Sequence, residues 1–326
     1  MENKPFIAVI IIALALIAVL YVVNSGAPGD NKVRIGDLPV VHGLPLYVAM
    51  EKGYFKEAGI EVERIKFEAP NQIIDALLQK KVDFGSPSIA LGITGIADYR
   101  EPGELKVYAV SGEVGDNSGE NLITPINSTL SSISELKGKK LGILAGTIQW
   151  RTIAREILSQ NGLDMDKDLT IVELSGALMV QALESGQIDA LLALEPIPTI
   201  AIENGVGKML MKAPAKNYIA DPFWYGAGVV RSDFAEQNPE LTKKVIEIFE
   251  KAIDEINKNP EEYRKYLKGY TPLTDDLISK SPIADFKICK DLDATDIDSI
   301  EKFYNIFTKH KVIDGEIDID GLLYCK

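Results

Sequence analysis

Short runs of apolar residues alternate along the chain with longer stretches in which apolar positions recur at helical spacing. Strands and helices are predicted in turn over Val33–Gly36, Leu46–Phe55, Ile60–Phe67, Asn71–Lys80, Val82–Gly85 and Leu105–Val110. Strands separated by helices are typical of parallel pairing, because parallel strands need a long crossover. This order predicts an α/β fold whose sheets are mostly parallel and flanked by helices.

The alternation stops over Ser111–Asn121, which is rich in Gly, Ser and acidic residues, and then resumes. The second series is predicted over Lys140–Leu144, Ile148–Gln160, Leu169–Leu174, Met179–Glu184 and Ile188–Leu194. Ala220–Val230 is expected to return the chain, and Leu241–Asn257 has the pattern of an amphipathic helix. We therefore predict a two-lobed clamshell, with lobe 1 formed by residues 32–115 and 225–326 and lobe 2 by residues 116–224. Two crossings of this kind permit hinge motion.

The first residues predict a membrane segment. The apolar run Phe6–Val23 has the length of a spanning helix, about 17–25 residues, rather than the roughly 7–15 of a cleavable signal. Residues 1–31 are thus interpreted as an anchor and tether with the body outside the cell membrane. The alternative is a cleaved segment and a secreted body. In such a compartment Cys289 and Cys325 are able to pair, although two separate thiols are equally compatible with the sequence.

Charge and motifs narrow the function further. The 326 residues carry a formal net charge of −13, which argues against a nucleic-acid partner. No GxxxxGK[ST] sequence is present, so no nucleotide site is expected, and we predict no cofactor. The acidic stretch from Asp314 to Asp320 is interpreted as a solvated strand rather than a calcium loop, because apolar residues interleave it and Gly321 is not at the sixth loop position. No metal site is predicted.

Several segments, taken in their order and spacing, resemble one family of proteins. They are His42-Gly43-Leu44-Pro45-Leu46-Tyr47-Val48-Ala49, Glu51-Lys52-Gly53-Tyr54-Phe55, Gly59-Ile60-Glu61-Val62, Asp83-Phe84-Gly85, Leu136-Lys137-Gly138-Lys139-Lys140-Leu141-Gly142, Ala182-Leu183, Gly186-Gln187-Ile188-Asp189-Ala190 and Glu195-Pro196. The chain resembles the nitrate, sulfonate, taurine and thiamine-precursor group of type II periplasmic solute-binding proteins.

This resemblance implies a periplasmic-binding-protein clamshell that serves an ABC uptake transporter. The implied partners are a permease and its ATPase, and the implied solute is a nitrate-, sulfonate-, taurine- or bicarbonate-like anion or a pyrimidine precursor. The resemblance implies a binding protein rather than an enzyme. The alternative is an enzyme on the same fold, of the pyrimidine-precursor or menaquinone-pathway type.

In lobe 1, the candidate ligand contacts follow predicted strands or begin helices, where an α/β sheet places its site. They are Asp37, His42, Asn71, Gln72, Ser86 and Ser88. Each has a structural alternative. His42 either donates a hydrogen bond to a ligand or serves the fold, and Asn71 either caps its helix or helps to bind. The two serine hydroxyls are expected to face the cleft.

Lobe 2 and the crossings add a second set of candidates: Gly112, Thr147, Gln149, Trp150, Glu195, Trp224 and Tyr225. Thr147 precedes a helix whose N-terminus favours an anion. Trp150 either stacks on a flat ligand or packs against the sheet. Glu195 is expected at the hinge-side wall, and Trp224 with Tyr225 at the cleft floor.

Overall fold

The computed structural model describes residues 31–325. The predicted anchor falls almost entirely outside this range. Within the described range, none of the helices combines the length and apolar character needed to cross a bilayer.

In the described part of the chain, the first sheet has six strands in the order β11-β4-β10-β3-β1-β2. Their bounds are β1 (Lys32–Asp37), β2 (Glu61–Lys66), β3 (Phe84–Ala90), β4 (Leu105–Glu113), β10 (Phe223–Arg231) and β11 (Asp285–Ile288). Strand β1 pairs in parallel with β2 and β3, whereas β10 runs antiparallel to β3 and β4, and β11 runs antiparallel to β4.

The second sheet has five strands among the residues that the structure describes, in the order β7-β6-β8-β5-β9. They are β5 (Glu120–Pro125), β6 (Lys140–Leu144), β7 (Thr170–Leu174), β8 (Ala190–Leu194) and β9 (Gly207–Lys212). Both sheets are therefore mixed rather than mostly parallel. The physical reason is the pair of crossings: β5 and β10 carry the chain from one sheet to the other and enter against the direction of their neighbours.

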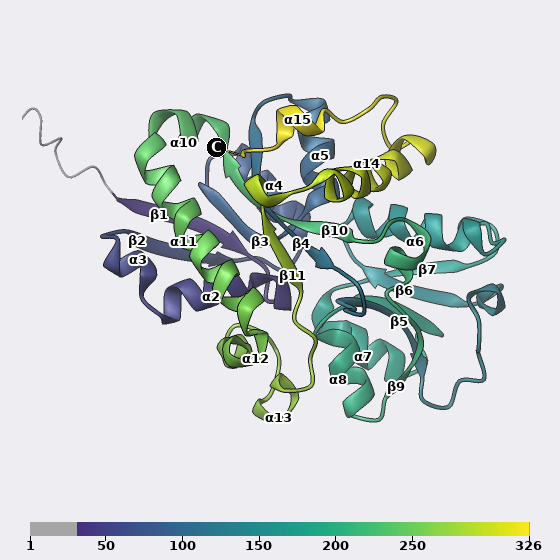
Figure 1. Cartoon of the computed structure of the whole chain (residues 1–326). Helices are drawn as coiled ribbons and strands as arrows, with labels where there is room; N and C mark the ends of the chain where they lie inside the picture. Colours follow the sequence, from purple (N-terminus) through teal and green to yellow (C-terminus); the bar gives the residue numbers. More distant parts are fainter. Residues whose placement is uncertain (1–30, 326) are drawn as a thin grey trace, which may run out of the picture.

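Helices cover both sheets, and Figure 1 shows the two halves side by side. The helices are α2 (Leu44–Glu51), α3 (Tyr54–Glu57), α4 (Pro70–Leu78), α5 (Leu91–Arg100), α6 (Ile148–Gln160), α7 (Gly176–Glu184), α8 (Ile197–Glu203), α9 (Pro214–Tyr218), α10 (Ser232–Gln237), α11 (Pro239–Lys258), α12 (Pro260–Tyr263), α13 (Asp275–Ile278), α14 (Ala294–Lys309) and α15 (Ile319–Leu322). The four 3₁₀ turns described are η1 (Val41–Gly43), η2 (Ile133–Leu136), η3 (Arg264–Leu267) and η4 (Cys289–Asp291).

Two predictions about local structure were wrong. The helix expected over Leu46–Phe55 is divided into α2 and α3, because Gly53 between them has a φ of 74°, which is left-handed and ends a helix. The acidic stretch predicted as a strand is a loop that leads into α15, where the Asp318 carboxylate accepts a hydrogen bond from the backbone N–H of Gly321.

Within residues 31–325, apolar residues form three buried clusters. One lies where α2 and α11 pack on the first sheet, and another lies where α7 and α8 pack on the second. The remaining cluster continues from one half of the molecule to the other and includes Trp150, Phe223 and Phe303. The two halves are thus joined by packed side chains as well as by the two crossings.

Candidate functional site

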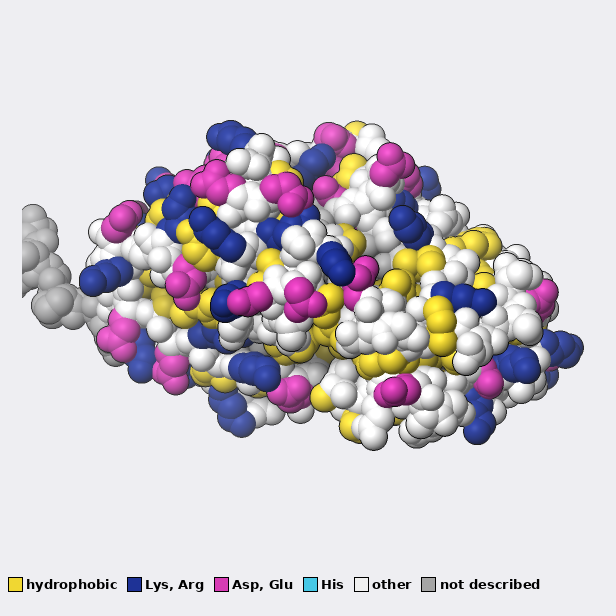
Figure 2. Space-filling model, turned by 90° about the horizontal axis from the view of Figure 1, so that it is seen from below, with side chains coloured by type: hydrophobic (Ala, Val, Ile, Leu, Met, Phe, Trp, Pro, Cys, Tyr) yellow, Lys and Arg dark blue, Asp and Glu magenta, His cyan; other side chains and the backbone are white. Residues whose placement is uncertain are grey.

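A cleft of about 550 Å³ lies between the two sheets. Its walls come mainly from the carboxyl ends of β1, β2, β6, β7 and β8 and from the loops and helices that follow them, which is where open α/β sheets bind ligands. The volume is in the usual range for small-molecule sites. Seen from below, hydrophobic side chains gather in the middle of the molecule between flanking charged groups (Figure 2).

The lobe 2 wall of the cleft is apolar. The lining residues described from this lobe are Leu144, Trp150, Gly176, Ala177, Met179, Val180, Leu192, Ala193, Leu194, Pro196, Ile197 and Ile200. Most of them belong to α7, α8 and the end of β8. This wall offers a solute van der Waals contact and the exclusion of water, with Trp150 as its aromatic member.

The lobe 1 wall carries the charges. Arg64 and Lys66 lie two residues apart on β2, so both side chains leave the same face of the strand, and Glu68 follows. Lys66 Nζ is 3.1 Å from Glu68 Oε1. Tyr270, in the loop after η3, closes this wall, and the guanidinium carbon of Arg64 lies 4.9 Å from its ring centroid.

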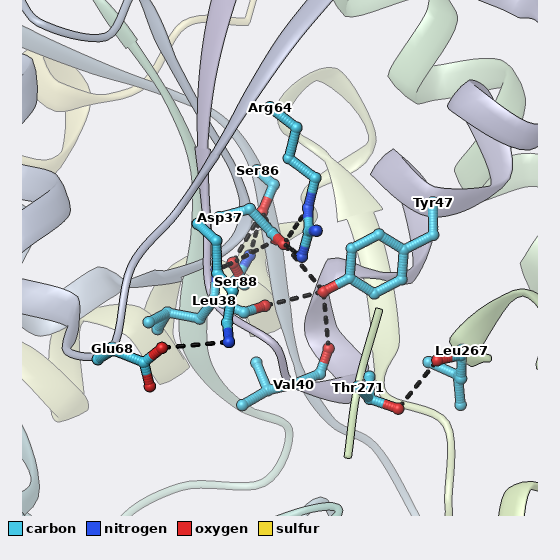
Figure 3. A network of polar contacts seen from close by, with 11 residues as sticks. Asp37, Leu38, Val40, Tyr47, Arg64, Glu68, Ser86, Ser88, Leu267 and Thr271 are labelled. Carbon is cyan, nitrogen blue, oxygen red and sulfur yellow. Dashed lines mark hydrogen bonds and ion pairs between the residues drawn. The ribbon is translucent and has the colours of Figure 1, made fainter. Parts of the chain in front are cut away.

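Three of the sequence candidates lie behind Arg64 rather than in the cleft lining. Asp37 is fully buried, and its Oδ2 accepts hydrogen bonds from Nε and Nη2 of Arg64 at 2.9 and 2.6 Å. Ser86 and Ser88 donate to Asp37 Oδ1 at 2.7 and 3.1 Å (Figure 3). Burial raises the pKa of Asp37, and Arg64 and Ser86 offset part of that rise. These residues support the cleft wall from beneath.

Other candidates gather around the crossings. His42 is buried against Tyr225, with ring centroids 5.1 Å apart, and burial lowers the pKa of His42 to about 3. Within residues 31–325, neither of its ring nitrogens has a hydrogen-bond partner. Burial also raises the pKa of Glu195 to about 7, and its carboxylate accepts from Asn121 Nδ2 at 3.3 Å. Gly112 lets β4 and β10 lie close together, because a Cβ at this position would lie 2.1 Å from the Phe223 carbonyl oxygen.

On α6, Thr147 and Gln149 take part in the fold's own hydrogen bonds. The Thr147 hydroxyl accepts from the backbone N–H of Trp150 at 3.2 Å and so caps the helix. Gln149 is buried; its Oε1 accepts from the backbone N–H of Gly92 at 2.6 Å, and its Nε2 donates to the Tyr225 carbonyl at 3.1 Å. Of the candidates in the predicted set, Trp150 alone is among the residues that line the cleft.

The remaining candidates lie outside the cleft lining. Gln72 accepts from the backbone N–H groups of Glu68 and Ala69 and caps α4. Asn71 lies against Gly146 of lobe 2, where an added Cβ would be 3.2 Å from the Asn71 Oδ1. Trp224 donates from Nε1 to Asp296 at 2.9 Å. The structure joins Cys289 and Cys325 in a disulfide.

Sequence reasoning missed Arg64, Lys66 and Tyr270. A signal for the first two was present, because Arg64 and Lys66 alternate on one face at the carboxyl end of a predicted strand. Tyr270 gave no such signal: more than two hundred residues separate it from Glu51, to which its hydroxyl donates at 2.6 Å. Only the return of the chain to lobe 1 brings them together.

The two mixed sheets and the interlobe cleft define a protein of the periplasmic-binding-protein fold. The solved alkanesulfonate-binding protein from Xanthomonas axonopodis pv. citri is similar in fold, with a TM-score of 0.74, 18% identity, and coverage of 92% of this chain and 99% of that one. Residues 41–263 match the family described as NMT1/THI5 like, and the chain belongs to that family.

Two curated relatives extend the comparison. A protein of Bacillus subtilis (strain 168) named as an aliphatic sulfonates-binding protein is 27% identical over 257 residues, which cover 74% of this chain and 72% of the relative. A 4-amino-5-hydroxymethyl-2-methylpyrimidine phosphate synthase of Saccharomyces cerevisiae is 24% identical over 254 residues, which cover 74% of this chain and 72% of the relative.

Proposed function

We propose that this chain is the substrate-binding component of an ABC-type uptake system and holds a small solute between its lobes. The observation that carries the proposal is the cleft of about 550 Å³, whose walls come from both sheets. A solute that contacts both walls stabilises the closed arrangement, and the closed form then differs in surface from the open form. That difference is what a transporter partner recognises.

We also propose where the protein is located and which partners receive the solute. The body lies outside the cell membrane, the segment of residues 1–31 attaches it there, and a permease with its ATPase receives the solute. Support comes from the name of the Bacillus subtilis relative, which is that of a binding protein, and from the apolar run Phe6–Val23.

The cleft walls bear on the class of solute. Sulfonates, nitrate, taurine, bicarbonate-like anions and pyrimidine precursors are the candidates from the resemblance. A nitrate or bicarbonate ion would fill little of about 550 Å³, and the apolar wall that includes Met179, Val180 and Ile197 would contact it poorly. The lining therefore favours a solute with an apolar body.

An enzyme of pyrimidine-precursor synthesis is the second candidate, and the yeast relative supports it. The hydroxyl groups of the cleft lining favour a binding protein instead. Among the lining residues, the hydroxyl of Thr271 donates to the Leu267 carbonyl, which does not act as a base. The hydroxyl of Tyr270 donates to the Glu51 carboxylate, but burial and this carboxylate raise the pKa of Tyr270 to about 12, which disfavours the phenolate that a nucleophile would need.

Thermal unfolding in the presence of a solute panel tests the proposal. The panel holds alkyl and aryl sulfonates, their amides, nitrate, bicarbonate, taurine and thiamine precursors. A solute that binds only the folded state adds about 2.7 kcal/mol at a hundredfold excess over its dissociation constant, which raises the midpoint temperature clearly. Mass spectrometry of the recovered solute separates the two candidates, because a binding protein returns it unchanged and an enzyme converts it.

A further inference from the structure

The carboxylate of Asp37 is saturated by polar groups of the protein. Besides the two Arg64 nitrogens and the hydroxyls of Ser86 and Ser88, the Tyr47 hydroxyl lies 3.0 Å from Oδ2. Figure 3 shows these side chains, from strands β2 and β3 and helix α2, converging on Asp37 of β1. A buried carboxylate with this many donors is held firmly, and so is the guanidinium that it contacts.

Every charge that lines the cleft is compensated by a neighbouring charge. The side chain of Arg64 is only 17% exposed, and its Nη2 is 2.6 Å from a carboxylate oxygen of Asp37. Lys66 pairs with Glu68 at 3.1 Å. The residues described in the lining include no further Lys, Arg, Asp or Glu. With Asp37 counted beneath the wall, the positive and negative charges of the site cancel.

The hydroxyl groups of the lining are likewise engaged. Tyr270 donates to Glu51 Oε1 at 2.6 Å, and Thr271 donates to the Leu267 carbonyl at 3.0 Å. A compact anion that entered this cleft would lose its hydration and would meet no uncompensated cation in return, which is unfavourable. An uncharged solute loses far less on entry, and the apolar wall of lobe 2 gives it contact.

We propose that Asp37 determines the specificity of the cleft, and that by cancelling the charge of Arg64 it selects uncharged, largely apolar solutes over anions of the same shape. This inference rests on the proposed function, since it concerns the solute held between the lobes. Asp37 does not line the cleft and would not touch the solute. It acts on the solute only through Arg64.

A different role for Asp37 predicts the opposite result. If Asp37 only oriented Arg64 toward a bound anion, its loss would weaken anion binding, because the guanidinium would become mobile. If Asp37 neutralises Arg64, its loss leaves a partly buried cation without a counter-charge, and anion binding becomes stronger. The sign of the change in affinity therefore separates the two roles.

The experiment measures binding of benzenesulfonate and benzenesulfonamide, and of benzoate and benzamide, by calorimetry. Native protein should bind the uncharged member of each pair at least about tenfold more tightly. Asp37→Asn should gain at least about tenfold in affinity for benzenesulfonate and for inorganic sulfate, and Arg64→Gln added to it should abolish that gain. Asp83→Asn is the matched control. Asp83 is also buried and pairs with an arginine, since its Oδ1 lies 2.7 Å from Arg34 Nη2, but neither residue belongs to the cleft lining.

The inference is overturned if native protein binds the charged member of a pair equally well or better, or if Asp37→Asn weakens sulfate and sulfonate binding. The first comparison uses native protein and so is independent of how well the variants fold. Failure of the proposed function looks different: native protein then shows no thermal shift with any solute of the wider panel, whereas Asp37→Asn still gains affinity for sulfate.

Discussion

The carboxylate of Glu113, at the end of β4, accepts a hydrogen bond from the backbone N–H of Glu120, at the start of β5. This contact closes the first crossing between the sheets. Both side chains are fully buried, and one carboxyl oxygen of each lacks a partner within residues 31–325. Burial raises the pKa of Glu113 to about 8, and burial together with the charge of Glu113 raises the pKa of Glu120.

The stability of the protein should therefore fall as pH rises between about 5 and 8. A carboxyl whose pKa is higher in the folded than in the unfolded state stabilises the fold below its unfolded pKa, and this contribution is lost as pH passes through the folded value. For Glu113 that window runs from its usual 4.5 to about 8. Thermal unfolding measured across this range in a common buffer series checks the expectation.

Glu113→Gln identifies the group responsible. An amide keeps an acceptor for the Glu120 N–H but does not titrate, so the variant should match native protein near pH 5 and exceed its midpoint temperature at pH 8. Glu184→Gln, at an exposed position of α7, should leave the pH profile unchanged. A Glu113→Gln profile that follows the native one throughout would contradict this account.

The sequence alone predicted the clamshell, because the restart of the βα alternation after Ser111–Asn121 is a feature of pattern. It could not predict which polar residues face the cleft. Ser86 and Ser88 follow a strand in the chain as a ligand contact would, yet both turn to Asp37, whose burial requires donors. Trp150 lines the cleft and also packs edge-on against Tyr225 of β10, with ring centroids 5.5 Å apart. Its stacking on a ligand stays a prediction.

Gln149 should stabilise the junction of the lobes. Gln149→Leu keeps most of the volume but leaves the Gly92 N–H and the Tyr225 carbonyl without this partner in a buried environment, so the free energy of unfolding should drop by about 1–3 kcal/mol. Urea unfolding measures it. Gln181→Leu, at an exposed position of α7, should change the free energy by no more than about 0.5 kcal/mol. Equal effects from the two variants would exclude a special role for Gln149.

The disulfide between Cys289 and Cys325 should contribute to stability by restricting the unfolded chain. The cysteines are 36 residues apart, and loop-closure entropy for such a separation amounts to about 4 kcal/mol. Replacing both residues with Ser should lower the midpoint of urea unfolding, and dithiothreitol should lower it for native protein but not for the variant. A reductant effect of the same size in both would show that the stabilisation has another source.

Closing the cleft from the lobe 2 side should abolish solute binding while the fold persists. Ile197 lines the cleft at the start of α8, and Ile197→Trp places a larger ring in the space that a solute needs. Any solute that raises the midpoint temperature of native protein should lose at least about tenfold in affinity for the variant. Leu178→Trp is the matched control, because Leu178 is 52% exposed on α7 and is not among the lining residues. Circular dichroism confirms folding of both variants. A solute that binds Ile197→Trp as tightly as native protein occupies some other site, and the cleft between the lobes would then lose its assignment as the binding site.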